Sequence, residues 1–499
     1  MVINIMEIKK EFSCLSKNVL CASKTINIDT SYQQTLESYL DDIYKIIKCS
    51  CHSYVTSCDV IEENVVISGK TKICLTYSNE ENELLFAEFL EDFSEKINLD
   101  GVSSSAFASA VACDKYCSYR VINQRRIDVH TTFQIAYKVY DLQSTAVIDK
   151  CSSSKLNTVE VNEMSVENFV ISRIDFEEEA SLSASNDGIK RVIGFDTQIK
   201  LVDEKTVNDK IFIKASVCVT ALYTNNKNEI EKITHTFDVS KIFEVAGIND
   251  NSKCFVELFE GCLYLKAKSY SDNTNGKIEI YGDIYAAITV LDEVKRKIIT
   301  DGYIAGYKTE NKYSNYNCYA NPTLYEKNAI EKFSIKTPQP IKKIDSLWVN
   351  TIQCTKKGDK LIASLCVCVI YENTNDEILH INASREMSYD LSNQSFLVLK
   401  ACMNSFDFNI IDETTVSINV DFNIEGCTVN EYDLTVLSDI DCCEGLKNSP
   451  AVTLYFAKSQ ERLWDIAKKF SSDIQLIKSE NDLNDDIIQS NKVIVIPGI

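Results

Sequence analysis

Stretches in which apolar and polar residues alternate recur along most of the chain. The clearest are residues 126–133, 277–284 and 415–422, where apolar side chains occupy mostly every second position. A period of two buries one set of side chains and leaves the other in water, and β-branched and aromatic residues suit this pleated surface. We therefore predict a mostly β protein built from antiparallel strands.

A second pattern indicates that these strands form repeated units. An apolar strand ending in tyrosine, at Tyr77, Tyr223 and Tyr371, is followed each time by a turn rich in Asn, Asp and Glu. The tyrosines are separated by 146 and 148 residues. Such spacing is typical of tandem domains, since solenoid repeats are several times shorter. The three predicted β-sandwich-like domains span residues 1–150, 158–310 and 325–440.

One tract near the N-terminus departs from the strand pattern. Its apolar residues match helical spacing, whereas the corresponding stretches of the other copies look extended. The residues are Leu36, Leu40, Ile43 and Ile47. Both a helix and an extended segment remain open here.

The end of the chain follows another order of elements. The pattern predicts a strand at 452–456, helices at 461–470 and 473–480, and a strand at 492–496. In the first helix, apolar residues recur at i, i+3, i+4 and i+7 and form one buried stripe. These are Leu463, Ile466, Ala467 and Phe470. We predict a small βααβ domain over residues 450–499.

Composition narrows the range of partners. The net charge of −21 opposes binding to nucleic acids and anionic bilayers. The basic segment 295–297 is isolated among acids and is interpreted as a solvated face. No apolar run is long enough to span a bilayer, and residues 1–11 lack the features of a signal peptide. We expect a cytoplasmic protein without nucleic-acid partners or membrane insertion.

The 20 cysteines are most simply explained as reduced thiols, many of them small core residues on apolar strands. Three close groups stand out, namely Cys49-Ser50-Cys51-His52, Cys113 with Cys117, and Cys442 with Cys443. With only four scattered histidines, these groups do not supply the paired ligands of a zinc site. We expect no metal and no cofactor, and oxidative cross-linking remains open.

Motifs for catalysis are missing from the sequence. It contains no phosphate-binding glycine loop, no metalloprotease helix and no nucleophile elbow. Carboxylate runs such as Glu177–Glu179 are typical of a wet acidic surface. We therefore predict a binding protein and not an enzyme.

The tail also carries a family resemblance. Residues 463–470, together with 481–483 and 493–497, resemble a LysM module. Three strand-rich units followed by such a module resemble the SPOCS-plus-LysM proteins of clostridial endospore formers.

Two turns of the tail differ from LysM modules that hold N-acetylglucosamine chains. Those modules usually have Gly-Asp-Thr or Gly-Asp-Ser before Leu-Trp, and Pro-Gly before the last strand. Here the positions hold residues 460–462, Gln-Glu-Arg, and 490–491, Ser-Asn. Glycine lets a ligand approach the backbone, whereas larger side chains obstruct it. We therefore expect the module to bind a protein in place of peptidoglycan; a module kept only as a folded cap is the simpler alternative.

The resemblance implies a non-enzymatic adaptor in spore coat assembly, made in the mother-cell cytoplasm and held at the forespore surface. Its LysM end would bind the coat morphogenetic ATPase, and its SPOCS units other spore envelope proteins. The expected partner-binding residues are Ser459, Gln460, Glu461, Arg462, Trp464, Asp482, Leu483 and Asn484. Trp464 could instead only pack the module's core. A peptidoglycan-binding or LysM-anchored wall-remodelling protein is the second hypothesis, and it needs an export signal and an open sugar groove.

Overall fold

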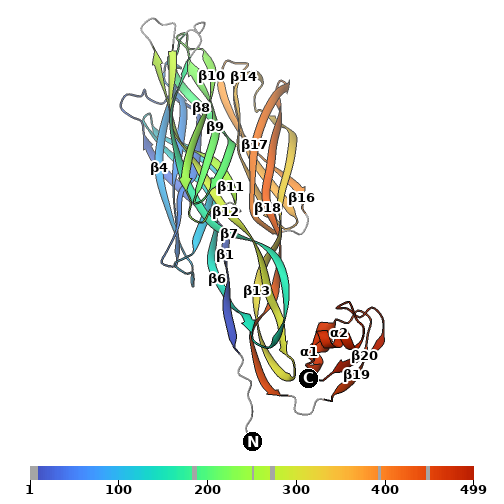
Figure 1. Cartoon of the computed structure of the whole chain (residues 1–499). Coiled ribbons are helices and arrows are strands. Elements are labelled where there is room, and N and C mark those ends of the chain that lie inside the picture. Colours follow the sequence, from blue (N-terminus) through green and yellow to red (C-terminus); the bar gives the residue numbers. More distant parts are fainter. Residues whose placement is uncertain are drawn as a thin grey trace.

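The computed structural model describes residues 9–181, 188–249, 252–269, 276–391, 395–445 and 450–498, and for 350–353 and 443–445 the backbone only. Three groups of six strands are followed by a small module with two helices (Figure 1). The first group comprises β1 (Lys10–Thr35), β2 (Lys45–Ile61), β3 (Asn64–Ser78), β4 (Leu84–Asn98), β5 (Phe107–Asn123) and β6 (Arg126–Cys151). The second comprises β7 (Ser154–Ser181), β8 (Arg191–Val207), β9 (Lys210–Thr224), β10 (Ile230–Glu244), β11 (Lys253–Ser269) and β12 (Gly276–Ile304). The third comprises β13 (Tyr307–Lys336), β14 (Ile341–Lys357), β15 (Lys360–Asn373), β16 (Ile378–Asp390), β17 (Ser395–Asp412) and β18 (Thr415–Gly445).

Each group repeats one topology. Its first strand pairs with its last and the last with its fifth, as in β1-β6-β5, while its middle strands form a second sheet, as in β2-β3-β4. The sheets β11-β12-β7 and β13-β18-β17 join through one pairing, between Ala320 and Glu163. All pairings between the named strands are antiparallel. The predicted mostly β, antiparallel fold is confirmed.

The alternating sequence pattern produces the sandwich cores. In β9, Ile211, Ile213 and Ala215 point inward, and in β12, Ile278 and Ile280 face them in the same cluster. Residues between them are more exposed, as a strand with one buried face requires. Burying such side chains away from water is the main favourable contribution to folding of each sandwich.

The repeated tyrosines mark an equivalent corner in each of the three sandwiches. Tyr77, Tyr223 and Tyr371 are fully buried. Two positions after each one, an asparagine side-chain oxygen accepts hydrogen bonds from two backbone N–H groups of the following turn. Asparagine suits this role because its short amide can stabilise a turn locally. These asparagines are Asn79, Asn225 and Asn373.

Beyond the sandwiches, the long first and last strands of the three groups continue together as a stem (Figure 1). One apolar cluster there includes Val147 of β6, Ile298 of β12 and Val436 of β18. A neighbouring cluster contains Ile148 and Leu437. Because all three groups contribute, the stem joins them in a common core.

A buried charged network crosses this stem. Glu163 of β7 binds Lys17 of β1 at 3.1 Å, and its other oxygen lies 3.1 Å from Nε of Arg296 of β12. Tyr316 of β13 donates its hydroxyl to the same second oxygen at 2.6 Å. The side chains of Lys17 and Glu163 are each 2% exposed. Arg296, interpreted from sequence as part of a solvated face, is therefore a partly buried partner in this network. A local run of charges does not reveal a distant carboxylate.

Two further features concern the N-terminal tract and the start of the third group. The tract from Leu36 to Tyr44 forms a loop and not a helix, and its residues Leu36 and Ile43 cover the core of the first sandwich. β13 starts at Tyr307, whereas the predicted third domain starts at residue 325. Pro322 lies inside β13, where the pairing with β18 shifts register. Proline lacks a backbone N–H and is tolerated at such irregularities.

Candidate functional site

The C-terminal module has the predicted βααβ order. It comprises β19 (Val452–Ala457), α1 (Leu463–Phe470), α2 (Ile474–Glu480) and β20 (Lys492–Pro497). Leu463, Ile466 and Ala467 of α1 are buried against Ile494 and Ile496 of β20. The stripe expected from the sequence is thus the core of the module.

Polar side chains set the ends of α2. Asp473 caps the N-terminus by accepting hydrogen bonds from the backbone N–H groups of Gln475 and Leu476. Asn481, after the last turn, donates to the carbonyl of Val495 and accepts from its N–H, both at 2.6 Å. The second helix is therefore fixed to the closing strand.

The predicted binding turn, 459–462, is tied to the segment before β20. Ser459 N–H donates to Asn491 Oδ1 at 2.7 Å, and its hydroxyl donates to the carbonyl of Gln489. Glu461 accepts from the Tyr455 hydroxyl at 2.7 Å, and Arg462 forms an isolated bridge with Ile487. The exposed side chains of this turn are Ser459, Gln460 and Arg462.

Gln460 occupies a backbone conformation that favours glycine. Its φ is +69°, in the left-handed region. The turn thus keeps a shape suited to glycine but places a long, exposed side chain there. This side chain stands where a ligand would have to approach the backbone.

The other predicted segment, Asp482–Asn484, lies after α2. Leu483 N–H donates to the carbonyl of Lys478 at 3.0 Å, and its side chain packs on the module's core. Lys478 also donates to the Asn484 carbonyl and pairs with Asp486 at 2.8 Å. Asp482 and Asn484 are exposed, so this segment presents mainly polar groups.

Trp464 contacts the stem of its own chain. Its indole Nε1 donates to Asp301 Oδ2 of β12 at 3.0 Å, and Lys468 Nζ lies 2.6 Å from Oδ1. The same Oδ1 accepts from the Tyr313 hydroxyl at 2.8 Å and from Asn311 at 3.1 Å. One partly buried carboxylate of β12 thus collects donors from both the module and β13.

Further contacts complete the docking of the module. The Tyr303 ring packs edge-on against Trp464, with centroids 5.2 Å apart, and its hydroxyl donates to the Ser472 carbonyl at 2.9 Å. Lys155 at the start of β7 pairs with Asp473 at 2.5 Å. Figure 1 shows the module beside the lower stem, with α1 nearest to it. The docked helix occupies one side of the module.

Docking of the module on the stem should be lost at acidic pH. Burial would raise the pKa of Asp301, but hydrogen bonds from Lys468 and Trp464 hold it below its ordinary value of 3.8. Burial would also raise the pKa of Asp473, but the hydrogen bond from Lys155 outweighs this effect, and the pKa of Asp473 is lowered. A carboxylate with a lowered pKa stabilises the docked state above its ordinary pKa, and this contribution is lost as the pH falls through the lowered value.

We therefore expect the module to undock below pH 3.8 and to stay docked between pH 5 and 7. The fluorescence of Trp464, recorded in a full chain carrying Trp348→Phe, measures this. Asp301→Asn should remove most of the acid transition, since the amide does not titrate. A transition of the parent protein centred above pH 5 would contradict the assignment.

The opposite side of the module has an apolar surface that the sequence analysis did not predict as a binding site. Val452, Leu454 and Phe456 of β19 are 55%, 71% and 61% exposed, and Val493 of β20 is 58% exposed. Phe456 and Val493 are directly paired across the strands. The sequence contains a signal for this surface. Residues 452–456 are nearly all apolar, so apolar side chains must lie on both faces of the strand.

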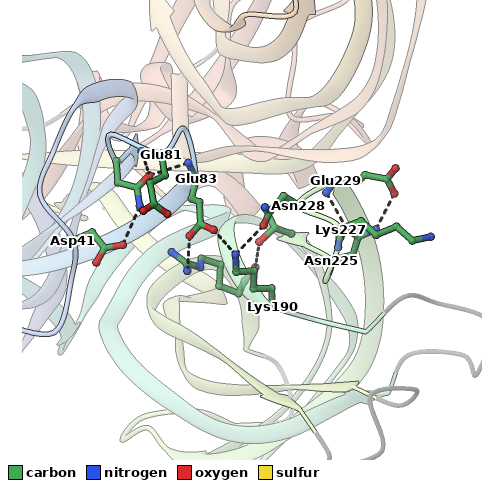
Figure 2. Close-up of polar contacts among 11 residues, drawn as sticks. Asp41, Glu81, Glu83, Lys190, Asn225, Lys227, Asn228 and Glu229 are labelled. Atoms are coloured by element: carbon green, nitrogen blue, oxygen red, sulfur yellow. Dashed lines mark hydrogen bonds and ion pairs between the residues drawn. The ribbon is translucent and has the colours of Figure 1, made fainter.

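A second candidate site lies where the turns of the three sandwiches meet. A cavity of about 480 Å³ is lined there by residues of all three groups. Figure 2 shows Glu83 of the first group reaching Lys190 of the second, and Lys190 donates to Asn228 at 2.9 Å. Glu83 also pairs with Arg191 at 3.0 Å. The hydrogen bond from Lys190 lowers the pKa of Glu83.

The cavity's charges pair with one another. In the third group, Lys343 pairs with Asp345 at 2.9 Å. Below the polar layer, Leu84, Ile193 and Trp348, one from each group, share an apolar cluster. This arrangement fixes the three sandwiches relative to one another, and we assign it a structural role.

The described part of the chain contains no group of three or more His, Cys, Asp or Glu side chains placed to hold a metal ion. Neither of its two helices is long and apolar enough to cross a membrane.

Comparison with protein families gives two matches. Residues 42–121 and 188–260 match the family model described as SipL, SPOCS domain, and residues 458–497 match the LysM domain. The SPOCS matches run from β2 into β5 and from just before β8 into β11, the same strands of the first two groups. Neither the curated proteins nor the solved structures that were searched give a significant match. The chain therefore combines SPOCS domain sequence, in its first two sandwiches, with a LysM domain docked on the shared stem.

Proposed function

We propose that this chain is a non-enzymatic adaptor of spore envelope assembly, whose LysM domain binds a coat morphogenetic ATPase at the forespore surface. The SPOCS and LysM matches support a sporulation-related adaptor. The observation that carries the proposal is the exposed apolar face of β19 and β20.

This face is available because the module docks through its other side. Trp464 and Lys468 of α1 bind Asp301 of the stem. Because β19 takes no part in this contact, Leu454 and Phe456 stay exposed. A contiguous exposed apolar surface rimmed by polar groups is typical of protein interfaces. Lys458 and Lys492 lie at one end of the face, so the partner surface should be apolar with carboxylates at the matching edge.

The turn residues that the sequence predicts as the binding site take a secondary role in this proposal. Gln460, Arg462, Asp482 and Asn484 are exposed and can add polar contacts beside the apolar face. Trp464 acts through docking, because its indole N–H and one ring surface are used within the chain. Sugar binding is less well supported, since the Gln460 side chain occupies the position where glycine would admit a glycan.

The sandwiches would hold other envelope proteins around this anchor. In the six-stranded sheet, β11 and β17 are the outer strands. Outer strands offer backbone groups to an added strand from a partner. The shared stem would keep these surfaces at fixed distances from the LysM end.

A binding measurement with the purified coat morphogenetic ATPase tests the proposal. The full chain carrying Leu454→Asp and Phe456→Asp should bind on the order of 100-fold more weakly, because two central apolar contacts are replaced by charges. Leu324→Asp is the matched control, since Leu324 on β13 is 62% exposed and lies outside the module.

Unchanged binding of the double variant, or equal loss in the control, would contradict the proposal. Saturable retention of the native full chain on insoluble peptidoglycan, with no binding to the ATPase, would favour the cell-wall function instead. In cells, a fluorescent fusion lacking residues 452–499 should no longer concentrate at the forespore.

A further inference from the structure

Three cysteines from two strands of the first sandwich lie close together. Cys49 and Cys51 lie on β2, and Cys117 lies on β5. The sulfur of Cys117 is 3.1 Å from that of Cys51 and 4.0 Å from that of Cys49. A disulfide needs the two sulfurs about 2.05 Å apart, so only a small movement of side chains separates the pair from bonding distance.

These thiols lie between two strand edges. β2 and β5 are the outer strands of the two sheets of the sandwich. Asp114 of β5 bridges them by accepting the Ser53 N–H at 2.9 Å and by contacting His52 at 3.3 Å. The two edges are therefore held side by side mainly through side chains.

The surroundings divide the three thiols into different roles. Hydrogen bonds from Cys49 and Cys51 lower the pKa of Cys117, against the opposing effects of burial and of Asp114. The contact with Cys117 raises the pKa of both partners, so the negative charge belongs on Cys117. A thiolate is the form that attacks disulfides. Cys117 and Cys51 are partly exposed, whereas Cys49 is buried.

We propose that Cys117 and Cys51 are an oxidation site that forms an intramolecular disulfide on reaction with a low-molecular-weight disulfide, with Cys49 as a second thiol that can exchange onto Cys117. The described residues include no arrangement fit for a metal ion, so the cluster is not assigned to metal binding.

The reaction has two balanced steps. The Cys117 thiolate attacks one sulfur of the small disulfide, forms a mixed disulfide and releases one small thiolate, which takes the Cys51 proton. The Cys51 thiolate then attacks the Cys117 sulfur and displaces the second small thiolate, which takes the proton that Cys117 had given to solvent. Two protein thiols are oxidised to one disulfide, and one small disulfide is reduced to two thiols.

Peptide mapping of the full chain tests this site. The native protein is treated with glutathione disulfide, quenched with acid, alkylated, and digested with trypsin without reduction. Cleavage after Lys48, Lys70, Lys115 and Arg120 should give residues 49–70 joined to residues 116–120. Fragmentation should place the bond at Cys51, and Cys49→Ala should leave the linkage intact.

Variants separate the roles of the three thiols. Cys51→Ala should move the bond to Cys49, and Cys117→Ala should abolish both linkages. Cys14→Ala is the control, because Cys14 is exposed on β1 and outside the cluster. Amide exchange in β2 and β5 should slow on oxidation and recover with a reductant.

The proposal is overturned if Cys117 stays reduced while exposed Cys14 and Cys21 become glutathionylated. It is also overturned if the linkage forms only after unfolding in urea. Both results are obtained with the unsubstituted chain, so they do not depend on whether a variant folds.

Discussion

Replacing Glu163 with alanine should lower the free energy of unfolding by about 3–5 kcal/mol. Glu163 is the common partner of Lys17, Arg296 and Tyr316, and both Lys17 and Glu163 are almost fully buried. Removing the carboxylate leaves the buried Lys17 and the partly buried Arg296 without their counter-charge, which is more costly than losing an exposed ion pair. Urea unfolding, followed by circular dichroism, measures the change.

Controls separate the charge from the general effect of substitution. Glu326→Ala, at an exposed position of β13, should change stability by less than about 0.5 kcal/mol. Combining Glu163→Gln with Lys17→Met should cost less than the sum of the single changes, because each removes the partner that the other needs. Additive losses, or equal effects of Glu163→Ala and Glu326→Ala, would show that the network does not stabilise the stem.

Asp301→Ala should release the LysM domain from the stem, with a loss of roughly 3–5 kcal/mol in docking free energy. The carboxylate accepts from Trp464, Lys468, Tyr313 and Asn311. Alanine leaves these donors without their shared, partly buried acceptor, while the core of the module is untouched. Small-angle scattering should show a larger radius of gyration, and Trp464 emission should shift to longer wavelength.

Asp238→Ala is the matched control for this experiment. Asp238 on β10 is half exposed and pairs with Lys214 at 2.8 Å, an exposed ion pair of the kind that contributes little. Its removal should leave scattering and fluorescence unchanged. A compact, native-like scattering curve for Asp301→Ala would contradict the docking role.

The spacing of apolar residues is enough to predict individual strands and helices. The alternation in 126–133 became part of β6, and the apolar stripe beginning at Leu463 became α1. Between residues 36 and 47 the same reasoning leaves a helix and an extended segment open, because helical spacing of a few apolar residues also fits a loop that folds onto a core. Pattern shows that a side chain is buried, but not what covers it.

The contacts that hold the sandwiches, stem and module together cannot be predicted from local sequence patterns. Trp464 meets a carboxylate 163 positions earlier in the chain, and Cys51 meets Cys117 across two sheets. Neither spacing resembles a known motif. The exposed apolar face was within reach, because the strand from Val452 to Phe456 is apolar on both sides. The resemblance to LysM modules directs attention to the turns instead, since such modules are expected to bind there.

The stem also limits how such a protein can be rearranged. Lys17, Glu163 and Tyr316 come from the opening strands of the first, second and third groups, and each supplies different chemistry to one shared point. Three identical copies of any one group would bring together like charges or three phenols there. The buried residues of the stem therefore require one order of the three groups. A chain in which a group is shuffled or duplicated should fail to form the packed stem.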